Sequence, residues 1–278
     1  MNNDKDRFTF PAAIFSYEDS NAVIQSIAFK DESLFHLKKL KELSDLVEPF
    51  DIELRRNLLK NVRLHDKGIF RVKGNYDEIY LRTRKIFEDG KLPITFANNH
   101  LVSLYNVGIC DENTAIVIFD AHADCKQEYQ NKKFSKATWL RRFIEFSNPK
   151  QIALIGIRSL DEEELEFLDE NEVFYLASTE IKNDFSKSLE EFDKFMKNFE
   201  SVFVSFDVDV IDPSIIPGVN FPEPLGLSLN DVFTFFESLR EKKFRGIDIV
   251  EFKHIKGMEM NEITITKIFY RLLDVTFG

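Results

Sequence analysis

The chain has 278 residues, of which 44% are apolar and 13% aromatic, and its formal net charge is -11. A chain of this length and composition can bury a large core, which excludes general disorder and favours one large α/β domain. The negative charge opposes binding to nucleic acid and is compatible with a small cationic partner. The sequence has no apolar run of about 20 residues and no signal-peptide pattern at MNNDKDRF, so we expect a cytoplasmic protein without membrane contact.

The first 90 residues give a weaker pattern than the rest. Residues 8–15 are predicted to form an early strand, and residues 34–46 and 76–87 are predicted to form helices. No repeat, low-complexity tract or Pro/Gly/Ser-rich linker divides the chain. We therefore interpret residues 1–278 as a single domain with a divergent N-terminal part, residues 1–90.

From residue 93 onward, short apolar runs alternate with amphipathic segments. Strands are predicted at residues 93–97, 114–119, 151–157, 173–177, 202–206 and 246–252. Helices are predicted at residues 135–146, 161–170, 179–199, 229–242 and 264–275. This alternation predicts an α/β fold, a three-layer sandwich with a mostly parallel central sheet of about eight strands. In such a sheet, binding sites lie at the C-terminal edge of the strands.

Two carboxylate-rich segments follow two of these predicted strands. DAHAD at residues 120–124 follows the run TAIVIF, and DVD at residues 207–209 follows VFVSF. If the extended backbone continues, the acidic and imidazole side chains of each segment share one side of the strand. Carboxylates held close together repel one another, and a divalent cation removes that repulsion. The two segments therefore predict a metal site.

Two further strand ends carry candidate site residues. His100 follows the run PITFA, and Glu251 ends the run GIDIVEF. Taken alone, His100 is more often a surface or helix-capping residue, and Glu251 a solvated acid at a strand end. Between them, Asp212-Pro213 and Pro217-Gly218 have the rigid turn chemistry of a loop that could wall a pocket.

These motifs together resemble the arginase/agmatinase family, the ureohydrolases, which hydrolyse guanidino or related amidino groups. DAHAD matches the family's Asp-Ala-His-x-Asp block without change, and SFDVDVIDPSIIPGVNFPEPLGLS at residues 205–228 matches its long signature. ANNHL at 97–101, GIRS at 156–159 and DIVEF at 248–252 are similar to further blocks. The resemblance runs from about residue 93 to the C-terminus and implies an arginase-like fold.

The resemblance also implies a metal centre and its chemistry. Asp120 and Asp207 would bridge two Mn²⁺ ions, and Glu251 would pair with a small cationic guanidino substrate. Carboxylates and imidazoles without thiolates suit manganese, and two ions can turn a shared water into a hydroxide nucleophile that Asp124 would orient. Family members are often trimers or hexamers, so a homo-oligomer is expected. The implied metal ligands are His100, Asp120, His122, Asp124, Asp207 and Asp209.

The chain departs from the family pattern near the substrate. Lys136 in SKATWLRR stands where the family has a proton-shuttling histidine. It is either a tuned acid that needs a lowered pKa, a binder of an anionic substrate group, or a first-turn helix residue in an impaired enzyme. Asn99 and Leu101 alter the surroundings of His100, which predicts weaker metal binding there. Residues 219–221, VNF, add bulk beside the expected substrate.

The first hypothesis is a manganese-dependent amidinohydrolase that converts agmatine or a similar guanidino compound to urea and an amine. Agmatine is favoured over arginine because the arginase-type Ser-Gly-Asn contact after Asp124 is absent. A second alternative is a formiminoglutamase or another guanidino-acid hydrolase, because Lys136 could pair with a substrate carboxylate. The alternative from another class is a catalytically weak, metal-binding family member that serves as a regulatory or structural subunit.

Overall fold

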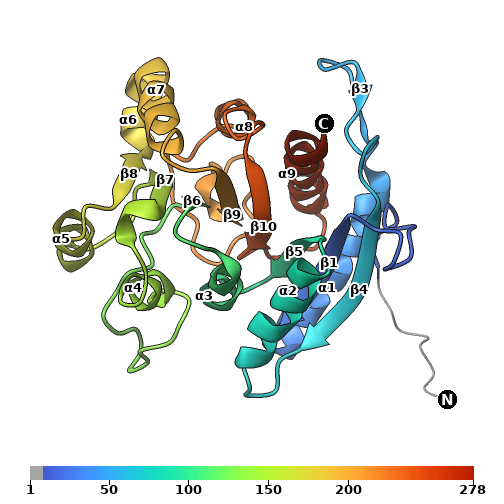
Figure 1. The fold of residues 1–278 in the computed structure, drawn as a ribbon, viewed down its shortest axis with the longest axis horizontal. Helices are drawn as coiled ribbons and strands as arrows, with labels where there is room; N and C mark the ends of the chain where they lie inside the picture. The colour runs from blue at the N-terminus through green and yellow to red at the C-terminus, as the bar shows by residue number, and fades with distance from the viewer. Residues whose placement is uncertain (1–8) are drawn as a thin grey trace.

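A parallel sheet of eight strands forms the centre of the protein in the computed structural model, which describes residues 9–278 (Figure 1). Its spatial order is β4-β1-β5-β10-β9-β6-β7-β8, and all neighbouring pairs are parallel. The strands are β1 (Ala22–Ala28), β4 (Leu64–Arg71), β5 (Leu92–Ala97), β6 (Thr114–Phe119), β7 (Ile152–Ile157), β8 (Phe174–Ala177), β9 (Ser201–Asp207) and β10 (Lys243–Val250). A separate antiparallel hairpin pairs β2 (Phe50–Asp51) with β3 (Arg56–Asn57). The predicted fold class is confirmed.

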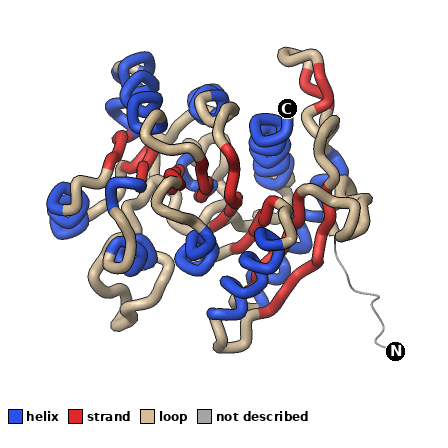
Figure 2. Tube along the Cα trace, viewed as in Figure 1, coloured by secondary structure: helices blue, strands red, loops and turns tan. Residues whose placement is uncertain are grey.

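Helices cover both faces of the sheet, as the blue coils on either side of the red strands show (Figure 2). On one face α3 contacts α2 and α4, and on the other α9 contacts α1 and α8. The helices are α1 (Asp31–Leu43), α2 (Asp77–Glu88), α3 (Leu101–Asn106), α4 (Trp139–Ile144), α5 (Glu162–Glu170), α6 (Ser178–Asn183), α7 (Phe185–Met196), α8 (Leu229–Glu237) and α9 (Met260–Phe277). Within the described chain, no helix is both long and apolar enough to cross a membrane.

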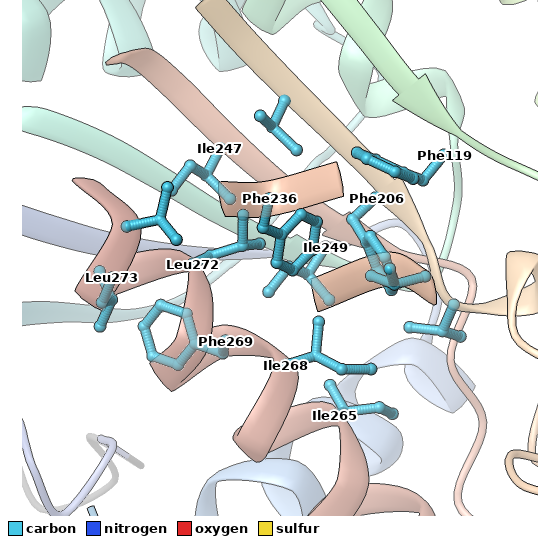
Figure 3. Packing of buried hydrophobic residues seen from close by; sticks show 14 of the residues in the cluster. Phe119, Phe206, Phe236, Ile247, Ile249, Ile265, Ile268, Phe269, Leu272 and Leu273 are labelled. Atoms are coloured by element: carbon cyan, nitrogen blue, oxygen red, sulfur yellow. The ribbon is translucent and has the colours of Figure 1, made fainter. Parts of the chain in front are cut away.

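The alternation of side chains along each strand divides the core between the two faces of the sheet. On β6, Val117 and Phe119 face one cluster, whereas Ile116 and Ile118 face the other. The first cluster continues into α8 and α9, where aromatic and aliphatic side chains pack against the sheet (Figure 3). Because both faces are covered, the central strands are mostly apolar, and polar side chains within them, such as Thr95, Ser205 and Asp248, are buried.

The structure corrects the interpretation of the N-terminal part. Residues 9–15 of the predicted strand 8–15 form turns rather than a strand, and Phe8 lies outside the described residues. Two strands of the central sheet, β1 and β4, lie in this region and were not predicted, and neither was the short β2–β3 hairpin. Gln25 and Ser26 make β1 look only partly apolar, although every residue of this strand is buried. Residues 1–90 thus contribute two strands to the same sheet.

Several predicted helices have different limits in the structure: the helix predicted at 229–242 ends at Glu237, and the helix predicted at 264–275 begins at Met260. The predicted helix 179–199 is broken at Asp184, whose non-helical backbone ends α6 and whose side chain accepts a hydrogen bond from the Lys187 amide to begin α7. The predicted helix 135–146 begins only at Trp139. Before it, the Thr138 hydroxyl accepts from the Ser135 amide and holds a turn.

Phe236 on α8 offers a test of this packing. It is fully buried, and its ring centroid lies 5.3 Å from Phe119 and 5.8 Å from Phe206. We expect Phe236→Ala to lower the free energy of unfolding by about 3–5 kcal/mol in urea titrations, because it removes apolar contacts and leaves a cavity. The control Phe146→Ala, at a residue that is 86% exposed, should change stability little. Equal losses in the two variants would refute this description of the core.

Candidate metal centre and substrate pocket

The candidate site lies at the C-terminal ends of four adjacent strands, in the order β5-β10-β9-β6. His100 follows β5, Glu251 follows β10, Asp207 ends β9, and Asp120 follows β6. Parallel strands carry their C-terminal ends to one edge, so residues up to 151 positions apart in the sequence meet there. The sequence analysis placed the site at this edge.

Five of the six candidate ligands form two overlapping groups that share Asp120, and the sixth, Asp124, lies beside the first group. His100 Nδ1 lies 3.0 Å from Asp120 Oδ2, 3.1 Å from Asp124 Oδ2 and 3.3 Å from Asp207 Oδ2. The second group brings His122 Nδ1 to 3.1 Å from Asp209 Oδ2 and 3.5 Å from Asp120 Oδ1. The two oxygens of Asp120 thus face different groups, which is the geometry of a bridging carboxylate. Asp207 belongs to the first group, and its bridging role stays a prediction.

Simple continuation of the strands explains only part of this arrangement. Asp124 has φ 49°, so the extended backbone ends before it, and its side chain is held by the Trp139 indole N–H at 3.2 Å. Asp209 lies in a short 3₁₀ turn, where its amide donates to Asp207 Oδ1 at 2.9 Å. The assumption of extended geometry was therefore wrong for both segments, although their side chains do gather as expected.

The unpaired atoms of this cluster fit a metal centre. Among the described residues, His100 Nδ1 and Asp120 Oδ2 are buried without a hydrogen-bond partner. Burial, together with the charges of Asp209 and Asp120, raises the pKa of Asp207 well above its usual range. Burial opposes a charge on His100, yet the neighbouring carboxylates raise its pKa well above 6.5. Carboxylates and imidazoles around unpaired atoms are ligands for a hard or borderline divalent ion.

Glu251 and Lys136 form an ion pair beside the metal cluster. Glu251 has φ 63°, its Oε1 accepts from the His100 amide at 2.9 Å, and its Oε2 lies 2.5 Å from Lys136 Nζ. Burial lowers the pKa of Lys136, but the charge and hydrogen bond of Glu251 and the charges of Asp207 and Asp124 together outweigh burial, so the pKa is raised. The role of Lys136 as a tuned acid depends on the charge of bound metal and stays a prediction. Lys136 also lies in the turn before α4, so the interpretation as a first-turn helix residue was wrong.

Residues 219–221 close over this ion pair. The Asn220 side-chain amide donates to Glu251 Oε2 at 3.0 Å, and the Phe221 ring lies 4.3 Å from Lys136 Nζ. The same ring lies 6.4 Å from the His122 ring. The bulk predicted from the sequence thus lies between Glu251 and the candidate ligand His122.

A buried polar chain fixes the orientation of His100. Its Nε2 lies 2.9 Å from Ser205 Oγ, which lies 3.0 Å from Ser103 Oγ, and Ser103 donates to Asp248 Oδ2 at 2.8 Å. Burial raises the pKa of Asp248 to about 7, against the opposing hydrogen bond from Ser103. With Nε2 donating along this chain, Nδ1 presents its lone pair to the cluster. Asn99, which was expected to act here, instead accepts from the Leu101 amide.

Ser205 tests the role of this chain. We expect Ser205→Ala to weaken Mn²⁺ binding about tenfold to a hundredfold, because ligand orientation depends on the hydrogen bond to the second imidazole nitrogen. Calorimetric metal titration measures the effect. Ser147→Ala, which removes a hydroxyl bonded to the Phe143 carbonyl far from the cluster, is the control. Unchanged metal affinity in Ser205→Ala would show that the chain has no part in binding.

A cavity of about 380 Å³ opens from the cluster. Several residues of its lining were not selected from the sequence, among them Lys126, Ser159 and Glu223. Ser159 and Glu223 lie within the GIRS and PEP motifs, so they could have been predicted from the sequence. Lys126 lies in an irregular loop, whose path could not be predicted.

Comparisons with known proteins agree with this geometry. The model of the arginase family matches residues 34–273. An uncharacterized 32.2 kDa protein of Methanothermus fervidus is 32% identical over 251 residues, covering 88% of this chain and 86% of its own length. The chain belongs to the arginase family. The N(1)-aminopropylagmatine ureohydrolase of Synechocystis is 25% identical, covering 96% of this chain and 92% of its own. The crystal structure of the agmatine ureohydrolase of Thermoplasma volcanium matches with a TM-score of 0.85 and 26% identity, covering 96% and 94% of the chains.

Arginase-family membership confirms the resemblance predicted from the motifs, and the match now includes most of the N-terminal part. It also confirms that the protein is a hydrolase acting on linear amidine C–N bonds. The arginase-like fold places the candidate ligands and the cavity at the edge where the sequence analysis expected them.

Proposed function

We propose that the protein is a manganese-dependent amidinohydrolase that releases urea and an amine from agmatine or a similar guanidino compound. The observation that carries this proposal is the overlap of two ligand groups through Asp120, with Glu251 held beside them. Relatives named as agmatinases and as an aminopropylagmatine ureohydrolase support this substrate class.

Two metal ions fit the cluster of His100, Asp120, His122, Asp124, Asp207 and Asp209. Bound there, the ions would supply the Lewis acidity that activates water at neutral pH. The protein's own contribution is to fix the ligands: Ser205 orients His100, and the Ala121 amide donates to Asp209 Oδ1 at 3.1 Å. We assign manganese because the ligand set holds carboxylates and imidazoles without thiolates.

Three side chains would act on the substrate. Glu251 is the anion that orients the guanidinium, and substrate binding must exchange its contact with Lys136 for one with the substrate. Asp124 accepts a hydrogen bond from the attacking water and directs its lone pair toward the guanidinium carbon. Lys136 donates a proton to the departing amine. A lysine ammonium has a pKa close to that of an alkylamine, so this transfer is nearly balanced in free energy.

Lys136→Met tests the last assignment. We expect kcat for agmatine to fall about a hundredfold, because general acid catalysis of this kind contributes a factor of about 10²–10⁴. KM should not rise, since the variant frees Glu251. Lys132→Met, at an exposed lysine of the same loop, is the control. If Lys136→Met keeps full kcat, another group supplies the proton.

The activity itself is tested with purified protein, Mn²⁺ and a panel of agmatine, arginine, guanidinobutyrate and formiminoglutamate. We expect urea from agmatine at the highest kcat/KM. Formamide from formiminoglutamate would instead identify a formiminoglutamase. Bound metal without product from any compound would favour a regulatory or structural subunit. A trimeric or hexameric assembly and a cytoplasmic location stay predictions from the sequence.

A further inference from the structure

The charges in the substrate cavity are not evenly balanced. Four acids line it besides the metal-ligand aspartates, and they are Asp161, Glu164, Glu223 and Glu251. Two lysines line it as well. Lys126 Nζ contacts the Asp161 carboxylate and lies 2.9 Å from Glu164 Oε2. Lys136 pairs with Glu251. Each lysine of the lining is thus already engaged with carboxylates.

Glu223 is the exception among these acids. Its Oε1 accepts a hydrogen bond from the Ser159 hydroxyl at 3.1 Å. Within the described part of the chain, no lysine or arginine nitrogen forms an ion pair with its carboxylate. Arg158 is near enough for the charge of Glu223 to act on its pKa, but its guanidinium donates to backbone carbonyls. Glu223 therefore faces the cavity as a carboxylate without a cationic partner.

The position of Glu223 is fixed relative to the metal cluster. Arg158 donates to the carbonyls of Glu223 and Pro224 at 2.9 and 3.0 Å, and to the carbonyl of the ligand Asp209 at 2.7 Å. Ser159, which binds the Glu223 carboxylate, forms a parallel bridge with the ligand His122. The Arg158 guanidinium thus connects the backbone of Glu223 to that of Asp209. The Ser159 hydroxyl orients the Glu223 carboxylate beside the segment of His122.

We propose that Glu223 binds a second cationic group at the far end of the substrate. This inference rests on the proposed function, in which the guanidinium end lies against Glu251 and the metal cluster. A substrate with a positively charged tail finds an unpaired carboxylate in Glu223. A substrate with a carboxylate tail is repelled by Glu223 and finds no unpaired lysine at that end, because Lys126 is paired with Asp161 and Glu164 and the proposed function assigns Lys136 to the leaving amine at the guanidinium end. The favoured substrate class is therefore a guanidine that carries an amine, rather than a guanidino acid.

The experiment compares three guanidines of similar length in the Mn²⁺-loaded enzyme: agmatine with an ammonium tail, butylguanidine with a neutral tail, and guanidinobutyrate with a carboxylate tail. We expect kcat/KM to fall in that order. In Glu223→Gln, which keeps an acceptor for Ser159, KM for agmatine should rise about tenfold to a hundredfold, the range of a hydrogen bond to a charged group. Butylguanidine should be unaffected, and guanidinobutyrate should improve.

The control variant is Glu166→Gln, which removes the same charge from an exposed position on α5. It should leave all three substrates unchanged. Equal losses for agmatine and butylguanidine in Glu223→Gln would overturn the proposal, because they indicate a structural role. A wild-type enzyme that prefers guanidinobutyrate would overturn it as well. Failure of the wild-type enzyme to hydrolyse any of the three contradicts the proposed function instead, and binding of agmatine over butylguanidine, measured by calorimetry, then decides the role of Glu223.

Discussion

Asp120→Asn should reduce kcat/KM for agmatine by at least about a thousandfold, which corresponds to about 4 kcal/mol of lost transition-state stabilisation. Asp120 is the one residue common to both candidate ligand groups, with an oxygen directed at His100 and the other at His122. An amide replaces one of these oxygens by a donor and removes the charge. Both metal positions should therefore be impaired together.

Metal content and stability separate this effect from unfolding. Asp120→Asn should bind fewer than two Mn²⁺ per chain, measured by elemental analysis after gel filtration. Without metal it should be no less stable than the wild type, because it removes one of four clustered carboxylates. The control Asp77→Asn changes an exposed residue at the start of α2. Full activity and two bound ions in Asp120→Asn would show that Asp120 does not bridge the site.

Glu251→Gln should lower kcat/KM for agmatine about a hundredfold or more while two Mn²⁺ ions stay bound. Glutamine can still accept from the His100 amide, so the fold of the strand end is kept. The negative charge that attracts the guanidinium is lost, and a charged hydrogen bond contributes about 1.5–3 kcal/mol. Steady-state kinetics and metal analysis on the same samples give the result.

The two variants should differ in their metal content. Asp120→Asn loses metal and activity together, whereas Glu251→Gln loses activity alone. If Glu251→Gln also loses metal, its hydrogen bond to the His100 backbone maintains the ligand cluster, and its role is positioning. If it retains full activity, the guanidinium binds elsewhere in the cavity.

The fold of residues 93–278, which contain the family motifs, was predictable because the sequence patterns of its strands are local. Apolar runs such as TAIVIF are buried on both faces, and the residues after them fall at one edge of a parallel sheet. β1 and β4 were missed because their polar side chains are satisfied by distant partners. Gln25 donates to Thr83, and buried Asp66 pairs with Lys41 at 2.7 Å. Such partners cannot be read from neighbouring residues.

The candidate site could likewise be predicted only in part. The six proposed ligands follow strands or sit within intact motifs, so their gathering could be predicted. The ion pair between Lys136 and Glu251, and the path that brings Lys126 into the cavity, depend on irregular loops. The left-handed backbone at Asp124 could not be predicted either, because a non-glycine residue adopts this conformation only under tertiary constraint.

The most direct test of the proposed function is urea release from agmatine as metal-free protein is titrated with Mn²⁺. The rate should rise with added metal and saturate at two ions per chain. Removing the metal with a chelator should abolish the activity, and Mn²⁺ should restore it. Urea release from the metal-free protein, or no urea with two ions bound per chain, would contradict a two-metal amidinohydrolase.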